Sequence, residues 1–251
     1  LAPIYHKLLI QNNKLELPSC FLNIGGVANL TYWDGQILHG FDTGPGNGLM
    51  DTFIRSISQN FYDKNGEIAS KGIPNKILIK SFLNDIFFKK SPPKSLDRNS
   101  FKIYYDKLLK KKLSTPDTLA TLLAFTVESI VAAIDILPKK IKSIVVTGGG
   151  YKNIYLMKCL KNKLKIKFYR ENELNANFDF VESELIAYLS ARSIYKLPFT
   201  FPSTTGVSIS SSGGKAIFYK NPNWFFIWNG LSLGAGGKMC LISEKGKVGL
   251  K

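Results

Sequence analysis

Residues 20–41, CFLNIGGVANLTYWDGQILHGF, decide the fold, because they read as three short strands in succession. β-branched and aromatic residues are frequent in Cys20–Ile24, Val27–Trp33 and Gln36–Phe41, and such residues favour strands. Asp34-Gly35, between the last two strands, is typical of a tight hairpin turn. Gly25-Gly26 joins the first two strands, and we expect a positive φ there, which glycine adopts without steric cost. The segment therefore predicts an antiparallel meander.

The second half of the chain follows a different pattern, in which strands alternate with helices. Ser143–Val146 is a short apolar strand followed by three glycines, and a helix begins near Asn153. Ile166–Tyr169 is a further strand and Val181–Tyr195 a further helix. This order predicts parallel strands joined by crossover helices. The fold class is therefore α/β, with a mixed sheet made of a β-meander and a parallel βαβ part.

Helices are expected between these two parts. Apolar residues recur at helical spacing over about Gly48–Asn60, Asn75–Leu83 and Phe101–Lys110. The segment 62–66 reads as a loop, and Pro92-Pro93 interrupts the helical series. A longer helix extends to about Ile136, with Thr115 as its N-cap and Pro116 at its first helical position.

The composition is that of an ordinary globular protein. The chain has 251 residues, of which 45% are hydrophobic and 21% charged, so it can build a core of its own. The longest apolar run, Leu119–Ile134, is interrupted by polar residues, so we expect no membrane span. Three widely spaced cysteines argue against a disulfide scaffold and a zinc site. We expect a cytoplasmic protein without a metal site built from its own side chains.

The net charge of +16 raises the alternative of a basic nucleic-acid-binding protein. The lysines are scattered through the whole chain, and the cluster in Lys107–Lys112 lies on the polar face of an expected helix. This distribution favours solvated lysine faces over a nucleic-acid site.

Three glycine-rich turns are the candidate ligand-binding motifs of the sequence. They are NIGGVAN at 23–29, GFDTGPGN at 40–47 and TGGGYKN at 147–153. Glycine lets backbone N–H groups approach a phosphate or a sugar, and a helix that begins after the turn adds the positive end of its dipole. Each turn alone is weak evidence, since a glycine pair is more often a structural turn. None is a Walker A loop, because no Gly-Lys-Ser/Thr follows.

Two carboxylates lie next to these turns or at a helix start. Asp42 could hold a magnesium ion through water or orient a substrate hydroxyl, or it could cap the following helix. Glu182 could accept hydrogen bonds from a sugar, or it could favour the helix dipole as a first-turn acid. The two histidines, His6 and His39, share no sequence context, and neither is assigned a catalytic role.

Taken together, the motifs resemble one family. Its blocks are matched, in order, by NIGGVANLT (23–31), GFDTGPGN (40–47), YDKNG (62–66), PPKS (92–95), DTLATL (117–122), GGGYKN (148–153) and PSTTG (202–206). The chain resembles the anhydro-N-acetylmuramic acid kinases over about residues 1–220, as the C-terminal part of such an enzyme.

The resemblance implies an actin-like ATPase fold of the ribonuclease H-like type, with two lobes around a cleft. Members of the family open the 1,6-anhydro ring of the muramic sugar and transfer the γ-phosphoryl group of ATP to O6, a step in peptidoglycan recycling. ATP, Mg²⁺ and a small-molecule amino sugar are the expected ligands. The resemblance places Gly148, Gly149, Gly150 and Asn153 on the adenosine side, Gly25, Gly26, Asn29 and Thr31 near the phosphates, Asp42, Gly44, Gly46 and Asn47 at the junction of phosphate and sugar, and Glu182 on the amino sugar.

The chain also departs from the family pattern. Members begin with a phosphate loop resembling GTMSGTS, and their catalytic aspartate lies upstream of the region matched by Ala2-Pro3; the printed sequence contains neither. We therefore expect the N-terminal lobe to be largely missing and the isolated chain to be inactive without that half, which could be separately encoded. A homodimer is a further expectation, and a non-catalytic, nucleotide-binding remnant is the alternative. Residues 221–251 match no family block, and we expect an extension that is poorly ordered.

Overall fold

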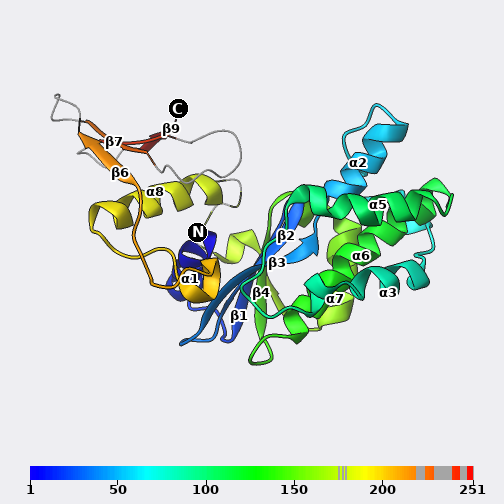
Figure 1. Cartoon of the computed structure of the whole chain (residues 1–251), viewed down its shortest axis with the longest axis horizontal. Helices are drawn as coiled ribbons and strands as arrows, with labels where there is room; N and C mark the ends of the chain where they lie inside the picture. Colours follow the sequence, from blue (N-terminus) through cyan, green and yellow to red (C-terminus); the bar gives the residue numbers. More distant parts are fainter. Residues whose placement is uncertain are drawn as a thin grey trace.

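The computed structural model describes residues 1–174, 176, 178, 180–218, 224–228, 239–243 and 248–250. Its centre is a five-stranded sheet in the order β3-β2-β1-β4-β5 (Figure 1). The strands are β1 (Ser19–Ile24), β2 (Val27–Trp33), β3 (Leu38–Pro45), β4 (Ser143–Thr147) and β5 (Lys167–Tyr169). β1, β2 and β3 pair antiparallel, whereas β4 pairs parallel with β1 and with β5. The predicted α/β class, with a meander joined to a parallel part, is confirmed.

Helices cover both faces of this sheet (Figure 1). One side holds α2 (Gly48–Ile57), α3 (Lys76–Leu83), α4 (Ile86–Lys89), α5 (Lys102–Leu109), α6 (Thr115–Asp135), α7 (Ile154–Leu164) and the short turns η1 (Lys64–Gly66), η2 (Ala69–Lys71), η3 (Arg98–Phe101) and η4 (Gly149–Lys152). The other side holds α1 (Ala2–Asn12), η5 (Glu171–Glu173), α8 (Val181–Ile194) and α9 (Pro202–Thr205).

Strand periodicity divides the core into two parts. Successive side chains of a strand point to opposite faces of its sheet. In β1, Cys20, Leu22 and Ile24 therefore pack toward α6 and α7, in a large cluster that includes Phe125. Phe21 points the other way and packs in the cluster of α1 and α8, which includes Val145 of β4. A sheet buried on both faces needs apolar residues at nearly every position, as β1 and β4 have.

The long helix α6 is the main support of the larger core. Its N-cap is Ser114, whose hydroxyl accepts a hydrogen bond from the Asp117 N–H at 3.2 Å. The prediction of Thr115 as N-cap is therefore wrong by one residue, because the serine before it supplies the capping oxygen. By length and hydropathy α6 could cross a membrane, contrary to the expectation from its polar residues, but 67% of the relevant window is buried inside the molecule. A core helix passes the same test.

Four further features differ from the expectations. β3 continues past Phe41 to Pro45, because a register shift at Ala28/Asn29 lets the pairing with β2 go on. Gly25 and Gly26 do not adopt positive φ. They allow the neighbouring chain to approach, since a Cβ on Gly46 would collide with the Gly25 carbonyl. The helix α1 was not predicted, and α2 ends at Ile57, before the expected Asn60.

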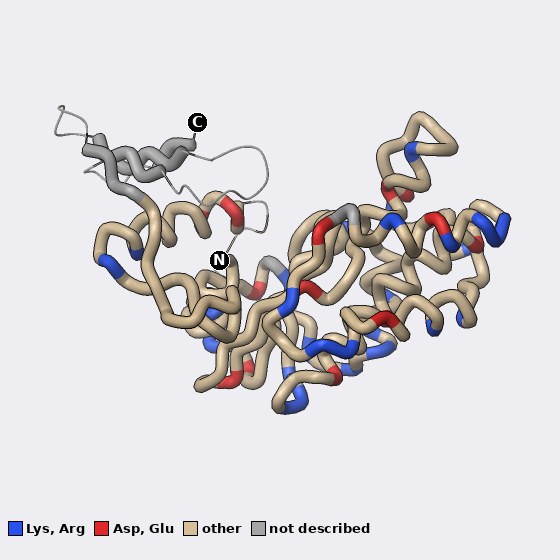
Figure 2. The backbone as a smooth tube through the Cα atoms, viewed as in Figure 1, with Lys and Arg blue, Asp and Glu red and all other residues tan. Residues whose placement is uncertain are grey.

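The charged residues are spread over the outer helices and loops (Figure 2). Lys107, Lys110, Lys111 and Lys112 are exposed, as expected of a solvated lysine face. Past α9, β6 (Lys215–Phe218), β7 (Trp224–Trp228), β8 (Met239–Ser243) and β9 (Val248–Leu250) form a four-stranded antiparallel sheet. Within 221–251 the structure describes only these strand segments, and the remainder of the expected extension lies outside the described residues.

Candidate active site

A row of polar side chains crosses four strands at one end of the sheet. In the strand registers, Asp42 of β3 pairs with Asn29 of β2, Asn29 with Asn23 of β1, and Asn23 with Thr147 of β4. Asn23 is the last residue but one of β1 and Thr147 is the last residue of β4, and each lies two residues beyond Phe21 or Val145 in its strand. The face that packs against α1 and α8 thus changes from apolar to polar at the carboxyl ends of the parallel strands, where open α/β sheets bind ligands.

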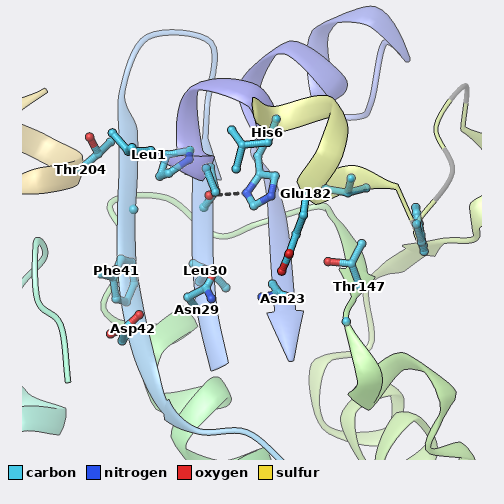
Figure 3. Close-up of a pocket in the computed structure, with 18 of the residues that line it drawn as sticks. Leu1, His6, Asn23, Asn29, Leu30, Phe41, Asp42, Thr147, Glu182 and Thr204 are labelled. Carbon is cyan, nitrogen blue, oxygen red and sulfur yellow. Dashed lines mark hydrogen bonds between the residues drawn. The ribbon is translucent and has the colours of Figure 1, made fainter. Parts of the chain in front are cut away.

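This polar row is the floor of a cavity of about 860 Å³. Figure 3 shows the side chains of Asn23, Asn29, Asp42 and Thr147 below that of His6, with the Glu182 side chain reaching down toward Asn23. The start of α1 and the first turns of α8, which pack against each other, line the cavity together with the segment Lys94-Ser95 and the turn Gly148-Gly149. Segments far apart in the sequence therefore meet around one space.

Asp42 fastens the segment 94–96 to the sheet. Its backbone N–H donates to the Lys94 carbonyl, and its Oδ2 accepts from the Leu96 N–H, both at 2.9 Å. Burial raises the pKa of Asp42, and the hydrogen bond from Leu96 opposes that rise. The alternative of a helix cap is wrong, because the N-cap of α2 is Asn47. Asp42 lies inside β3 because the strand is longer than expected.

Lys94 was not singled out from the sequence, although it lines the cavity and is 9% exposed. Its ammonium donates to the carbonyls of Phe87 at 3.1 Å and Phe88 at 3.4 Å, and it lies 4.8 Å from the centre of the Phe87 ring. Burial lowers the pKa of Lys94. These contacts tie the lysine to α4, so it supports the wall of the cavity.

His6 and Thr31 form a buried pair above the polar row. His6 Nδ1 lies 2.8 Å from Thr31 Oγ1, and the imidazole stacks on Phe21 with a centroid distance of 4.3 Å. Burial, with a smaller contribution from the Leu1 amino group, lowers the pKa of His6 to about 3. The imidazole is therefore neutral at neutral pH. His6 lines the cavity. The sequence did not predict this position, because the residues around His6 form no recognisable motif.

The glycine turn after β4 combines a strained position with an open one. Gly148 has φ 78°, and a Cβ there would meet Asn23 Oδ1 and the Ile24 carbonyl. A Cβ on Gly149 would have only the Asn47 amide nearby, at 3.4 Å. Next to this turn, the rings of Tyr151 and Phe178 meet edge to face at 5.6 Å, and both line the cavity.

The structure brings together six of the predicted site residues on the cavity, namely Asn29, Thr31, Asp42, Gly148, Gly149 and Glu182. Seven others do not line it: Gly25, Gly26, Gly44, Gly46, Asn47, Gly150 and Asn153. The backbone N–H groups of Gly46 and Asn47 bond to the carbonyls of Gly26 and Gly25, which occupies the donors expected to meet a phosphate. Asn153 caps α7, and a Cβ on Gly150 would collide with Ile24.

The protein has an open mixed sheet, with a polar cavity and a glycine turn at the carboxyl ends of the parallel strands. These features are typical of α/β domains that bind a small ligand at the ends of their strands. A family model described as anhydro-N-acetylmuramic acid kinase matches residues 1–220. The chain belongs to the anhydro-N-acetylmuramic acid kinase family, as its motifs predicted.

Similar proteins carry the same description. A protein of Rhodopseudomonas palustris (strain BisB18) is 39% identical over 217 residues, which cover 86% of this chain and 58% of the relative. One of Pelagibacter ubique (strain HTCC1062) is 39% identical over 224 residues, covering 85% and 59%. Both are named anhydro-N-acetylmuramic acid kinase. The chain spans somewhat more than half the length of these relatives.

Solved structures show a weaker likeness. An activator of the 2-hydroxyisocaproyl-CoA dehydratase from Clostridium difficile, with bound ADPNP, is similar with a TM-score of 0.40 and 10% identity over 69% of this chain and 64% of its own. A ligand-bound xylulose kinase from Lactobacillus acidophilus is similar with a TM-score of 0.38 and 12% identity over 68% and 39%. At such TM-scores, the family membership rests on sequence.

Proposed function

We propose that this chain works in an ATP-dependent kinase that opens the 1,6-anhydro ring of anhydro-N-acetylmuramic acid and phosphorylates O6. The product is N-acetylmuramic acid 6-phosphate, and the reaction belongs to the cytoplasmic recycling of peptidoglycan. The observation that carries the proposal is that residues from separate family motifs meet on one polar cavity in a chain of this family. Catalysis of this kind consists of positioning and charge stabilisation, which a preorganised polar row supplies.

We assign the nucleotide to the side of the cavity formed by the turn after β4. Gly149 leaves room for a close approach, and the aromatic pair of Tyr151 and Phe178 supplies the flat apolar surface that a base requires. Asn29, near the middle of the polar row, offers an amide to the phosphates. Gly148 shapes the turn but has no room for a side chain.

The residues present fit a magnesium ion that is held mainly by the nucleotide. Among the described residues no three His, Cys, Asp or Glu side chains gather into a metal-binding group. Mg²⁺ usually keeps several waters and binds through one or two carboxylates plus substrate phosphates. Asp42, in the floor of the cavity, is the carboxylate that fits this role. Bound there, Mg²⁺ would neutralise charge on the transferred phosphoryl group.

We assign the amino sugar to the part of the cavity lined by the starts of α1 and α8, where Glu182 extends its carboxylate toward the sheet (Figure 3). The general base and the first phosphate loop are expected from the N-terminal half, whether it is part of the same polypeptide or separately encoded. We expect this chain to be inactive when that half is absent.

The experiment that tests the function is an assay of ATP-dependent phosphorylation of 1,6-anhydro-N-acetylmuramic acid. The chain is assayed alone and with the N-terminal portion of a complete relative. Activity only in the combined sample supports the proposal. A folded sample that fails in both cases would make the chain a non-catalytic remnant and would overturn it.

Two variants of the active combination test the assigned roles. Asp42→Asn keeps an acceptor for the Leu96 N–H but removes the charge, so we expect kcat to fall roughly tenfold or more and the Mg²⁺ requirement to rise. Glu182→Gln should raise the KM for the sugar by roughly ten- to a hundredfold and leave the KM for ATP unchanged. The exposed Asp135→Asn and Glu16→Gln, outside the cavity, are the matched controls. Equal losses in variant and control would contradict the assignment.

A further inference from the structure

His6 is a buried side chain with one ring nitrogen satisfied and the other facing the cavity. The residue is 3% exposed, and Nδ1 is held by Thr31 Oγ1 at 2.8 Å. Within the described part of the chain, Nε2 has no hydrogen-bond partner. It is not among the fully enclosed polar atoms that lack a partner, and the residue lines the cavity, so Nε2 reaches open space there.

The orientation of the ring is fixed by its surroundings. Phe21 stacks on one face with an interplanar angle of 12°, and Thr31, which pairs with Phe21 in the register of β1 and β2, holds Nδ1. Because Nε2 opens on the cavity, a water or a ligand there can supply the hydrogen bond that the protein does not make. The fixed ring therefore presents one hydrogen-bonding atom to the cavity in a set direction.

We propose that His6 is a sugar-binding residue, whose Nε2 exchanges a hydrogen bond with a hydroxyl group of the amino sugar. This inference rests on the proposed function. A hydroxyl both donates and accepts, so it matches either tautomer of the neutral imidazole. Figure 3 shows the Glu182 side chain close to His6, and a sugar under the starts of α1 and α8 would meet both groups.

Two substitutions at the same position separate the cavity-facing nitrogen from the ring's structural role. Asparagine can place a polar atom near Nδ1 but nothing near Nε2, whereas glutamine can reach the position of Nε2. In the active combination, His6→Asn should raise the KM for the sugar roughly three- to tenfold, with the KM for ATP unchanged. His6→Gln should restore most of the affinity. If His6→Asn leaves the KM for the sugar unchanged, or changes only the KM for ATP, the proposal is wrong.

A second measurement does not depend on turnover. The chain has two histidines, so ¹⁵N-histidine labelling gives two sets of ring signals. His39, stacked near Tyr32 and outside the cavity lining, is the internal control. Adding 1,6-anhydro-N-acetylmuramic acid should shift the Nε2 signal of His6 and leave His39 unchanged. A shift with ATP alone, and none with the sugar, overturns the proposal.

The two tests distinguish failure of this inference from failure of the proposed function. Phosphorylation of the sugar without any effect at His6 overturns the inference and leaves the function standing. A sugar-induced shift of His6 without phosphorylation supports the inference and overturns the function. If the sugar is neither bound nor phosphorylated, both are wrong.

Discussion

Acidification should destabilise this protein through His6, because its imidazole is buried in the neutral form. Burial lowers the pKa of His6 to about 3 in the folded chain, against about 6.5 for a free histidine. The unfolded chain therefore binds a proton between these two values and the folded chain does not. A state that binds more protons gains free energy as pH falls, so the contribution of His6 to stability is complete above pH 6.5 and is lost below it.

The size of the effect follows from the two pKa values. At about pH 7.5 the unfolded histidine is almost fully neutral, and the penalty is close to zero. At about pH 5 the penalty is about 2 kcal/mol, because the unfolded chain is stabilised by its protonated histidine. This is a large part of the stability of an ordinary domain, which is about 5–15 kcal/mol.

The assay is urea unfolding of the parent chain and of His6→Gln at about pH 7.5 and pH 5. Glutamine does not titrate, so the variant should lose about 2 kcal/mol less than the parent between the two conditions. Other groups titrate in both proteins, and their contributions cancel in the difference. Identical pH dependence in the two proteins would refute the reasoning, since it would mean that His6 is not buried as a neutral group.

Two further predictions concern the turn after β4 and the start of α6. Gly148→Ala should lower the free energy of unfolding by about 1–3 kcal/mol, because of its positive φ and the collision with the Ile24 carbonyl. Gly149→Ala is the control and should cost less than 1 kcal/mol, so similar losses would contradict the explanation. Ser114→Ala should lower the free energy of unfolding by about 1 kcal/mol, because the N-cap hydrogen bond of α6 is lost; thermal or urea unfolding measures this. An equal loss in Thr115→Ala would contradict the assignment of Ser114 as the N-cap.

Local sequence signals were sufficient for β1, β2 and β4 and for most helices. Alternating and apolar runs fixed β1, β2 and β4, and Asn153 before an apolar helix marked the start of α7. The motif order led to the family, which the family model over 1–220 shows. These features depend on a few residues that are neighbours in the sequence, so they can be predicted from the sequence alone.

The continuation of β3 beyond Phe41 could not be predicted from local sequence signals. Gly40-Phe-Asp-Thr-Gly-Pro-Gly-Asn47 looks like a turn, because glycine and proline usually end strands. The segment stays in the sheet because a register shift opposite Ala28/Asn29 and the close approach of the chain at Gly25 and Gly26 give it partners. These contacts join separate segments, so the local sequence of β3 contains no signal for them.

The sequence by itself determined the fold class, the order of the strands in the central meander and parallel part, and the family, because each depends on periodicity or on a motif within a short stretch. Only the tertiary structure decided which motif residues share a cavity. The strand registers bring Asp42, Asn29, Asn23 and Thr147 into one row, and packing of α1 on β1 and β2 brings His6 above it. Such a row is set by pairing between distant segments, and no property of any single segment specifies it.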